Sequence, residues 1–148
     1  MKHVASIVIP ALLFGTGLGV ALAQPQIPLL QDVKKDLPFS AARQAGNTYY
    51  LSGEIPLKQD GTFEAGSTTA QTRQVMQNLK KTLHGLGCTF DDVVKVTVYL
   101  KSMEDYQEMN AAYRTYFSGE FPARECVGGL EIAFGSDLEI SAIAHKAL

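Results

Sequence analysis

The sequence predicts an α+β fold in one domain, with the element order ββαβαββ behind an N-terminal leader. Short stretches that alternate apolar and polar residues indicate strands, and two longer stretches with apolar residues three and four positions apart indicate helices. The chain has 148 residues, of which 46% are hydrophobic and 19% charged. This composition suits one compact core and argues against a disordered chain or a coiled coil.

The leader has the three parts of a secretory signal peptide. Lys2 and His3 form a short basic start, residues 4–22 are almost wholly apolar, and residues 21–23 form an AxA cleavage site. An uncleaved membrane anchor is the alternative, but Ser6, Pro10 and three glycines interrupt the apolar run. We therefore expect cleavage after Ala23.

Cleavage there predicts a periplasmic or secreted protein without a stable membrane anchor. No cysteine follows the AxA site directly, so a lipid anchor is not indicated. Residues 24–37 contain two prolines and mixed charges, which predicts an irregular lead-in. The folded domain is expected over residues 38–148.

The domain opens with a predicted β-hairpin. Residues 39–43 and 48–55 read as strands, and residues 44–47 between them include Gly46 and Asn47, which tolerate positive φ in tight turns. A polar loop follows over residues 56–66.

The next element is an amphipathic helix over residues 68–86. Its apolar residues recur at helical spacing, and Gly85 and Gly87 supply a stop. We interpret the apolar stripe as core; its members are Val75, Met76, Leu79, Leu83 and Leu86.

Residues 92–101 give the clearest strand pattern in the chain. One predicted face carries Val94, Val96, Val98 and Leu100, and the other carries Val93, Lys95, Thr97 and Tyr99. Ser102 then resembles an N-cap with an acidic residue at the third position, and helical spacing continues to Gly119.

Two final strands are expected over residues 123–130 and 138–144. Two helices of these lengths cover only one face of the predicted sheet. The residues assigned to the other face are too apolar for free solvent, which predicts association between copies of the chain; they are Val93, Thr97, Tyr99 and Ile143.

Charge and motifs exclude other classes of function. The net charge of −2 gives no field for binding nucleic acid. Ser52 lies in LSGE, without the first glycine of a GxSxG nucleophile elbow, and neither GxGxxG nor a Walker A pattern occurs. Three histidines without metal-ligand spacing predict no metal site. Cys88 and Cys126 are compatible with a disulfide or with two free, packed thiols.

Strand alternation places three chemically useful residues together. Arg124 and Cys126 share one face of their strand, and Glu139 points away from its apolar neighbours on the last strand. We expect Arg124 and Glu139 to converge on the face that the helices leave open. There an Arg fork binds a carboxylate and a Glu transfers protons. The residues alone also allow an ordinary surface salt bridge.

Six segments decide between these interpretations, because together they resemble the Rid (YjgF) family of reactive-intermediate deaminases. They occur in the family's order and span the chain after the leader: YYLSGEIPL (49–57), AQTRQVMQNLKKTL (70–83), DDVVKVTVYLK (91–101), NAAYRTYF (110–117), FPARECV (121–127) and LEISAIA (138–144).

This resemblance implies a chorismate-mutase-like protomer, a homotrimer with ligand clefts between subunits, and 2-iminobutanoate/2-iminopropanoate deaminase activity without a cofactor or metal. Arg124 then holds the substrate carboxylate, and Glu139 orients the hydrolytic water. The resemblance also places five residues at the cleft: Phe39, Ser52, Gly53, Asn110 and Cys126.

The chain departs from the family pattern at three places. Phe39 stands where active members commonly have Tyr, residues 127–132 replace the usual VxVAxLP run, and Ser141 stands where a second Glu is frequent. Two other functions therefore stay open. One is a non-catalytic trimer that binds small carboxylates or keto acids, and the other is a chaperone-like holdase.

Overall fold

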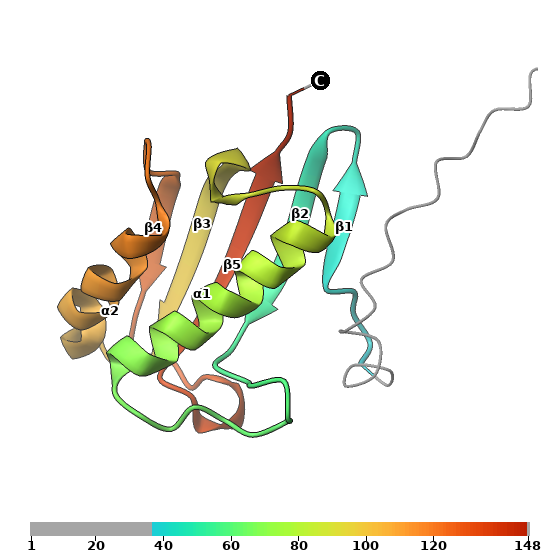
Figure 1. Ribbon diagram of the computed structural model, residues 1–148. Coiled ribbons are helices and arrows are strands. Elements are labelled where there is room, and N and C mark those ends of the chain that lie inside the picture. The colour runs from blue at the N-terminus through green and yellow to red at the C-terminus, as the bar shows by residue number, and fades with distance from the viewer. Residues whose placement is uncertain (1–36, 148) are drawn as a thin grey trace, which may run out of the picture.

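The computed structural model describes residues 37–147. These residues form a five-stranded sheet with strand order β1-β2-β5-β3-β4, antiparallel except for the parallel pair β3 and β4. Helices α1 and α2 lie against one face of the sheet, and the other face is open (Figure 1). The predicted signal peptide and residues 24–36 of the predicted lead-in lie outside the described residues.

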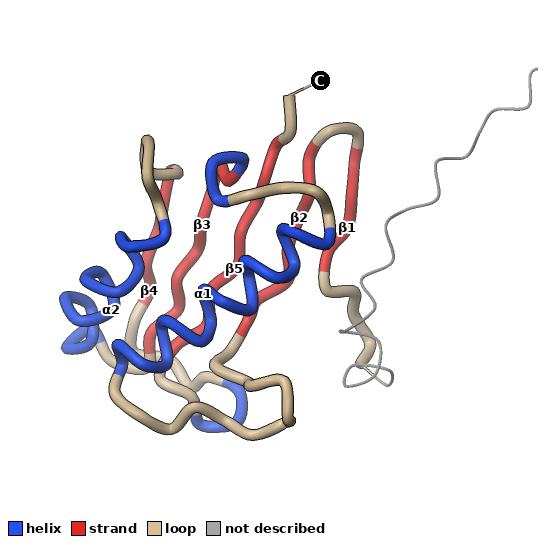
Figure 2. The backbone as a smooth tube through the Cα atoms, viewed as in Figure 1, coloured by secondary structure: helices blue, strands red, loops and turns tan. Residues whose placement is uncertain are grey.

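The element order confirms the α+β prediction and the succession ββαβαββ, which the tube in Figure 2 follows along the chain. The elements are β1 (Ala42–Ala45), β2 (Thr48–Glu54), α1 (Thr68–Gly85), β3 (Val93–Leu100), α2 (Tyr106–Tyr113), β4 (Ala123–Val127) and β5 (Leu138–His145). Among the described residues, no helix is long and apolar enough to cross a membrane.

The first strand lies three residues later than residues 39–43, so that prediction was wrong. Ala45 pairs with Thr48, which leaves Gly46 and Asn47 as a two-residue turn, with Gly46 at φ 57°. This short turn sets the register, and pairing with β2 then extends back to Ala42. Phe39 consequently precedes the hairpin.

Helix α1 forms where predicted and supplies one side of the core. The Ser67 side chain accepts a hydrogen bond from the Ala70 amide and caps the helix, and the chain leaves it through Gly87 at φ 70°. The helix buries Val75, Met76, Leu79 and Leu83 of the predicted stripe against apolar residues of β2, β3 and β5. Leu86, the fifth member, caps the end of the helix and is only partly buried.

Strand β3 confirms the alternation from Val96 onward but not at its start. The pairing with β5 shifts register between Val93 and Lys95. This irregularity turns Val93 into the core and leaves Val94 49% exposed. The assignment of Val94 to the helix-covered face and Val93 to the open face was therefore wrong.

The second helix is shorter than predicted, because aromatic packing ends it. Ser102 caps a 3-10 turn (Met103–Asp105), α2 follows, and a second 3-10 turn (Arg114–Tyr116) ends the helical stretch before Gly119. Phe117 is extended, and its ring packs 4.8 Å from Tyr113 and 5.2 Å from Phe90, measured between centroids. If the helix continued through Phe117, the Phe117 ring would move away from Phe90.

Strand β4 ends at Val127, three residues before the predicted end. Gly128 follows, and any side chain there would overlap Met103. Gly129 has φ 79°, which turns the chain away from the sheet. The glycine pair thus ends the strand and opens the loop that leads to β5.

The packing of α1 gives the first prediction. Leu79 is 1% exposed in the core, and replacing it with Ala leaves a cavity. We expect Leu79→Ala to lower the free energy of unfolding by about 2–5 kcal/mol in urea denaturation. The exposed neighbour Gln77 is the matched control, and Gln77→Ala is expected to change little. Equal losses in both variants would contradict the packing of α1.

Candidate active site

Arg124 lies on β4, opposite Val96 of β3, and its side chain packs on the helix-covered side of the sheet. The guanidinium carbon is 4.9 Å from the ring centroid of Tyr113 and 5.7 Å from that of Tyr106. Nη2 also donates to the Tyr106 hydroxyl at 3.3 Å. Two aromatic rings of α2 therefore hold the guanidinium in place.

No carboxylate in residues 37–147 forms an ion pair with Arg124. The neighbouring Glu125 points to the other face, where it contacts Lys95 Nζ at 3.3 Å and accepts from Thr97 Oγ1 at 3.0 Å. These two partners hold the pKa of Glu125 below its usual value. The half-buried guanidinium of Arg124 is thus a cation that can receive an anion.

A cavity of about 410 Å³ opens beside this guanidinium. It is lined by Tyr106, Asn110, Tyr113, Arg114, Phe121, Pro122 and Arg124. The structure therefore brings Arg124 and Asn110 together. We call this cavity the arginine pocket.

The arginine pocket includes residues that the sequence analysis did not single out. Tyr106 and Tyr113 lie on the same face of α2 as Asn110, at helical spacing, within the stretch that the sequence predicts as a helix ending at Gly119. Tyr113 is 4% exposed, and burial raises its pKa to about 12, against a smaller lowering by Arg124. Its hydroxyl has no hydrogen-bond partner among the described residues. In the sequence, the feature that could have identified Tyr106 and Tyr113 was their helical spacing around Asn110.

Glu139 lies on the opposite, open face, where it is paired across the sheet with Tyr99 of β3. Its side chain lies directly over Gly53 of β2, and a methyl group at Gly53 would overlap the Glu139 carboxylate. The register between β2 and β5 shifts between Leu51 and Glu54, next to this contact. Gly53 is therefore needed for the position of Glu139, and the structure brings these two predicted residues together.

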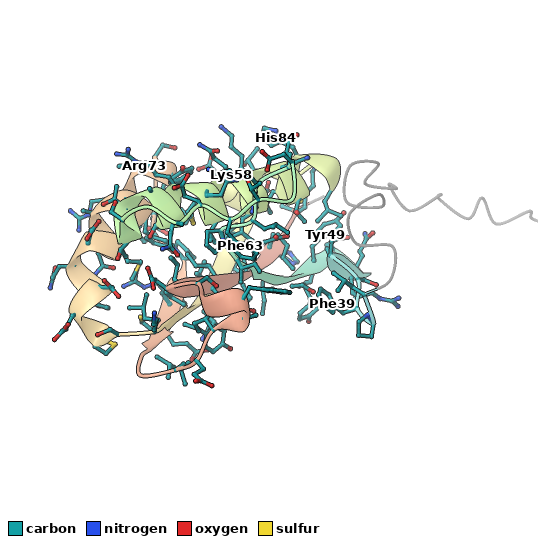
Figure 3. All side chains as sticks on the ribbon, turned by 90° about the horizontal axis from the view of Figure 1, so that it is seen from below. Phe39, Tyr49, Lys58, Phe63, Arg73 and His84 are labelled. Carbon is teal, nitrogen blue, oxygen red and sulfur yellow. The ribbon has the colours of Figure 1, made fainter. Side chains whose placement is uncertain are left out.

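Ser52 links this second cluster to the start of the described chain. Its hydroxyl donates to the Ser40 carbonyl at 2.6 Å, and its amide donates to the Ala41 carbonyl at 2.9 Å. Phe39 precedes Ser40 and is 53% exposed on the side of the β1–β2 hairpin away from α1, whereas Tyr49 points toward α1 (Figure 3). We call Ser52, Gly53 and Glu139 the glutamate cluster.

The expectation that Arg124 and Glu139 converge on the open face was wrong for a single protomer. Arg124 and Cys126 do share a face, but it is the face covered by the helices, because their partners on β3 are the buried Val96 and Val98. Glu139 alternates with the buried Leu138 and Ile140 and so points the other way. One protomer carries two half-sites on opposite sides of the sheet.

Both cysteines are free thiols in the structure, which answers the alternative left open by the sequence. Cys126 packs against the core beneath the arginine pocket, and Cys88 is buried beyond the end of α1. Burial raises the pKa of both thiols; Asp92 adds to the effect at Cys88, and Arg124 partly offsets it at Cys126. Neither thiol has the environment of a nucleophile.

Residues 37–147 contain no group of three or more His, Cys, Asp or Glu side chains that could hold a metal ion. The histidines in this part of the chain also lie apart from the pocket. His84 is exposed on α1, and His145 contacts the Thr48 hydroxyl at 3.1 Å. The charged groups at the two half-sites are the guanidinium groups of Arg124 and Arg114, which line the arginine pocket, and the carboxylate of Glu139.

Comparison with known proteins places this geometry in context. The model of the family described as endoribonuclease L-PSP matches residues 31–146. A RutC family protein of Pyrococcus horikoshii is 42% identical over 110 residues, which are 74% of this chain and 87% of that protein. The 2-iminobutanoate/2-iminopropanoate deaminase of Mus musculus is 39% identical over 108 residues, covering 72% of this chain and 80% of that enzyme.

Solved structures show the same fold. The crystal structure of the YjgF gene product from E. coli superposes with a TM-score of 0.72 at 32% sequence identity. The superposition covers 76% of this chain and 91% of that one.

The raised pKa values of the thiols give a second prediction. A protonated thiol is a poor nucleophile, so alkylation of Cys126 by iodoacetamide in a Cys88→Ser variant is expected to be slower at pH 7.5 than alkylation of free cysteine. Because the folded-state pKa is raised, the rate is expected to keep rising with pH beyond the point where free cysteine levels off. Faster alkylation than free cysteine at pH 7.5 would contradict this account.

Proposed function

Since the chain belongs to the endoribonuclease L-PSP family, known also as the Rid or YjgF family, we propose that it hydrolyses reactive 2-imino acids and their enamine tautomers. The products are 2-keto acids and ammonia. The observation that carries this proposal is the half-buried guanidinium of Arg124, which faces a cavity without a carboxylate partner in residues 37–147. Relatives named as imine deaminases support it.

Arg124 binds the substrate carboxylate in this proposal. A planar guanidinium donates two parallel hydrogen bonds to a carboxylate and stays charged at every physiological pH. Tyr106 and Tyr113 limit its rotation, so the carboxylate and the adjacent C=N carbon are held at a defined place. Asn110 lines the same cavity and supplies an amide for the nitrogen or the carboxylate.

Glu139 moves the protons. An imine is already electrophilic, so hydrolysis needs a placed water rather than a strong nucleophile. Glu139 takes a proton from water as the water oxygen bonds to the C=N carbon, and it passes this proton to the nitrogen to give a carbinolamine. Glu139 then takes the remaining proton from the new hydroxyl and delivers it to the nitrogen as the C–N bond breaks, so that the C=O bond forms and ammonia leaves. Because β4 is an edge strand, backbone groups near Cys126 are available to stabilise the tetrahedral intermediate.

The two half-sites need a second protomer to meet. Trimers are typical of this family, and the open face of the sheet carries exposed Tyr50 and Val127 together with Tyr99 and Ile143. Burying this face between subunits removes apolar surface from water. We propose a homotrimer in which the arginine pocket of one protomer faces the glutamate cluster of its neighbour.

Two other functions use parts of the same structure. A trimer that binds small carboxylates without turnover needs only Arg124, and a holdase needs only exposed apolar surface. Cleavage of RNA, which the family description names, commonly uses histidine as acid or base, and His84 and His145 lie outside the arginine pocket. If Arg124 and Glu139 meet as proposed, a carboxylate-binding cation and a proton-transferring carboxylate share one site, and this combination favours imine hydrolysis over these functions.

We also propose that the protein is exported. The family match begins at residue 31, downstream of the basic start, apolar run and AxA site. Expression of the full chain in a bacterium is expected to release a protein that begins at Gln24 on osmotic shock, as read by mass spectrometry. A chain lacking residues 2–23 is the control and is expected to stay in the cytoplasm. Retention of the uncleaved chain there would contradict export.

Variants at the two charged residues test the reaction. With 2-iminobutanoate generated by an amino-acid oxidase and trapped by semicarbazide, Glu139→Gln is expected to lower kcat by about 100-fold or more while it keeps affinity for 2-oxobutanoate. Arg124→Ala is expected to lower kcat/KM by about 10- to 100-fold and to lose that affinity.

The matched controls, Glu131→Gln and Arg43→Gln, change exposed residues of the same types and are expected to leave the rate unchanged. Binding of 2-oxobutanoate without faster imine loss in the unaltered protein would favour the carboxylate-binding function. Suppression of client aggregation by all variants, with no imine chemistry, would favour the holdase.

Mixed assemblies test whether the site lies between subunits. Arg124→Ala and Glu139→Gln chains are each expected to keep at most about a tenth of the activity alone. Equal amounts assembled at random into trimers are expected to regain about a quarter of the activity, because a neighbouring pair can restore one complete site. If both residues acted within one protomer, mixing would restore nothing.

A further inference from the structure

A second guanidinium lines the arginine pocket. Arg114 begins the 3-10 turn directly after α2, one residue beyond Tyr113, and it borders the same cavity as Arg124. Its side chain is exposed and forms no ion pair with any residue in the described part of the chain. The pocket thus presents two cations to one open cavity.

Three acidic side chains on α2 and its neighbouring elements have partners outside the pocket. No Asp or Glu is among its lining residues. Glu108 of α2 accepts from the Thr69 amide at 2.8 Å, and Asp105 accepts from the Thr68 hydroxyl at 2.7 Å, so both contact the start of α1. Glu125 is held by Lys95 on the open face. The positive charge of the pocket is therefore not neutralised by these neighbours.

The cavity has room for a ligand with a second carboxylate. Its volume of about 410 Å³ lies in the range of roughly 300–1,000 Å³ in which proteins bind ligands much larger than 2-iminobutanoate. The aromatic rings are less available for an apolar substrate. Tyr106 and Tyr113 contact the Arg124 guanidinium, and Tyr113 and Phe121 also pack on Phe117. The unused binding group of the pocket is the guanidinium of Arg114.

We propose that the arginine pocket recognises 2-imino dicarboxylates, the imines of aspartate and glutamate, in preference to imines with uncharged side chains. This inference rests on the proposed function. Arg124 binds the carboxylate next to the C=N carbon, and Arg114 binds the side-chain carboxylate. Arg114 is thereby the residue that determines specificity, while the hydrolytic step is the one already described.

Product analogues test this preference without requiring turnover. Binding of 2-oxoglutarate and 2-oxobutanoate is measured by calorimetry on the unaltered protein, Arg114→Gln and Arg114→Lys. The unaltered protein is expected to bind 2-oxoglutarate about tenfold more tightly, because one more charge-assisted hydrogen-bonded pair forms. Arg114→Gln is expected to abolish this difference and leave 2-oxobutanoate binding unchanged, and Arg114→Lys is expected to restore part of it.

Arg73→Gln is the matched control, because Arg73 is an exposed arginine of α1 outside the pocket (Figure 3). Equal affinity for the two keto acids, or an equal loss of both in Arg114→Gln, would overturn the assignment of Arg114. Tighter binding of phenylpyruvate than of 2-oxoglutarate would overturn it in favour of an apolar side chain.

Kinetics separate this inference from the proposed function. Hydrolysis of 2-iminobutanoate with no preference for 2-iminosuccinate leaves the proposed function intact and overturns the dicarboxylate assignment. Selective binding of 2-oxoglutarate that depends on Arg114, without hydrolysis of either imine, supports the dicarboxylate assignment and contradicts the proposed function.

Discussion

Successive side chains of a strand point to opposite faces of the sheet, and this alternation is the constraint on which the rest of the molecule depends. Packing of α1 and α2 on one side of the sheet requires Val96, Val98, Leu138 and Ile140 to point toward the helices. Arg124 and Cys126 pair with buried positions of β3 and share their side, whereas Glu139 alternates with buried positions of β5 and faces outward. A one-residue slip of β5 would exchange the faces of its side chains, so the core itself fixes the two charges on opposite sides.

This separation explains how a small sheet keeps an arginine and a glutamate from neutralising each other. Within one protomer, Arg124 rests on the rings of Tyr106 and Tyr113, and Glu139 rests on the backbone of Gly53. Each side chain is positioned by its own face of the sheet before any partner arrives. In the proposed trimer, association of protomers completes a site whose cation is already oriented and has no carboxylate partner within the described chain.

The sequence predicted the order of the elements, the stripe of α1 and the sharing of a face by Arg124 and Cys126, because each depends on local periodicity. It missed features that depend on contacts between distant residues. The register shift at Val93, the early end of α2 at the ring of Phe117 and the close approach of Gly128 to Met103 belong to this class. The face occupied by Arg124 was also missed. Alternation along a strand shows which residues share a face, but contacts between distant residues decide which face the helices cover. Residues of the family's motifs were found by resemblance, whereas Arg114 required the cavity to be seen.

The most direct measurement is a crystal structure of the assembled protein with 2-oxobutanoate bound. The account predicts the ligand carboxylate on Arg124 of one protomer, with the carboxylate of Glu139 from a neighbouring protomer within reach of a water at the ligand's C2 carbon. A ligand bound away from Arg124, or an assembly in which Glu139 faces solvent far from any arginine pocket, would contradict it.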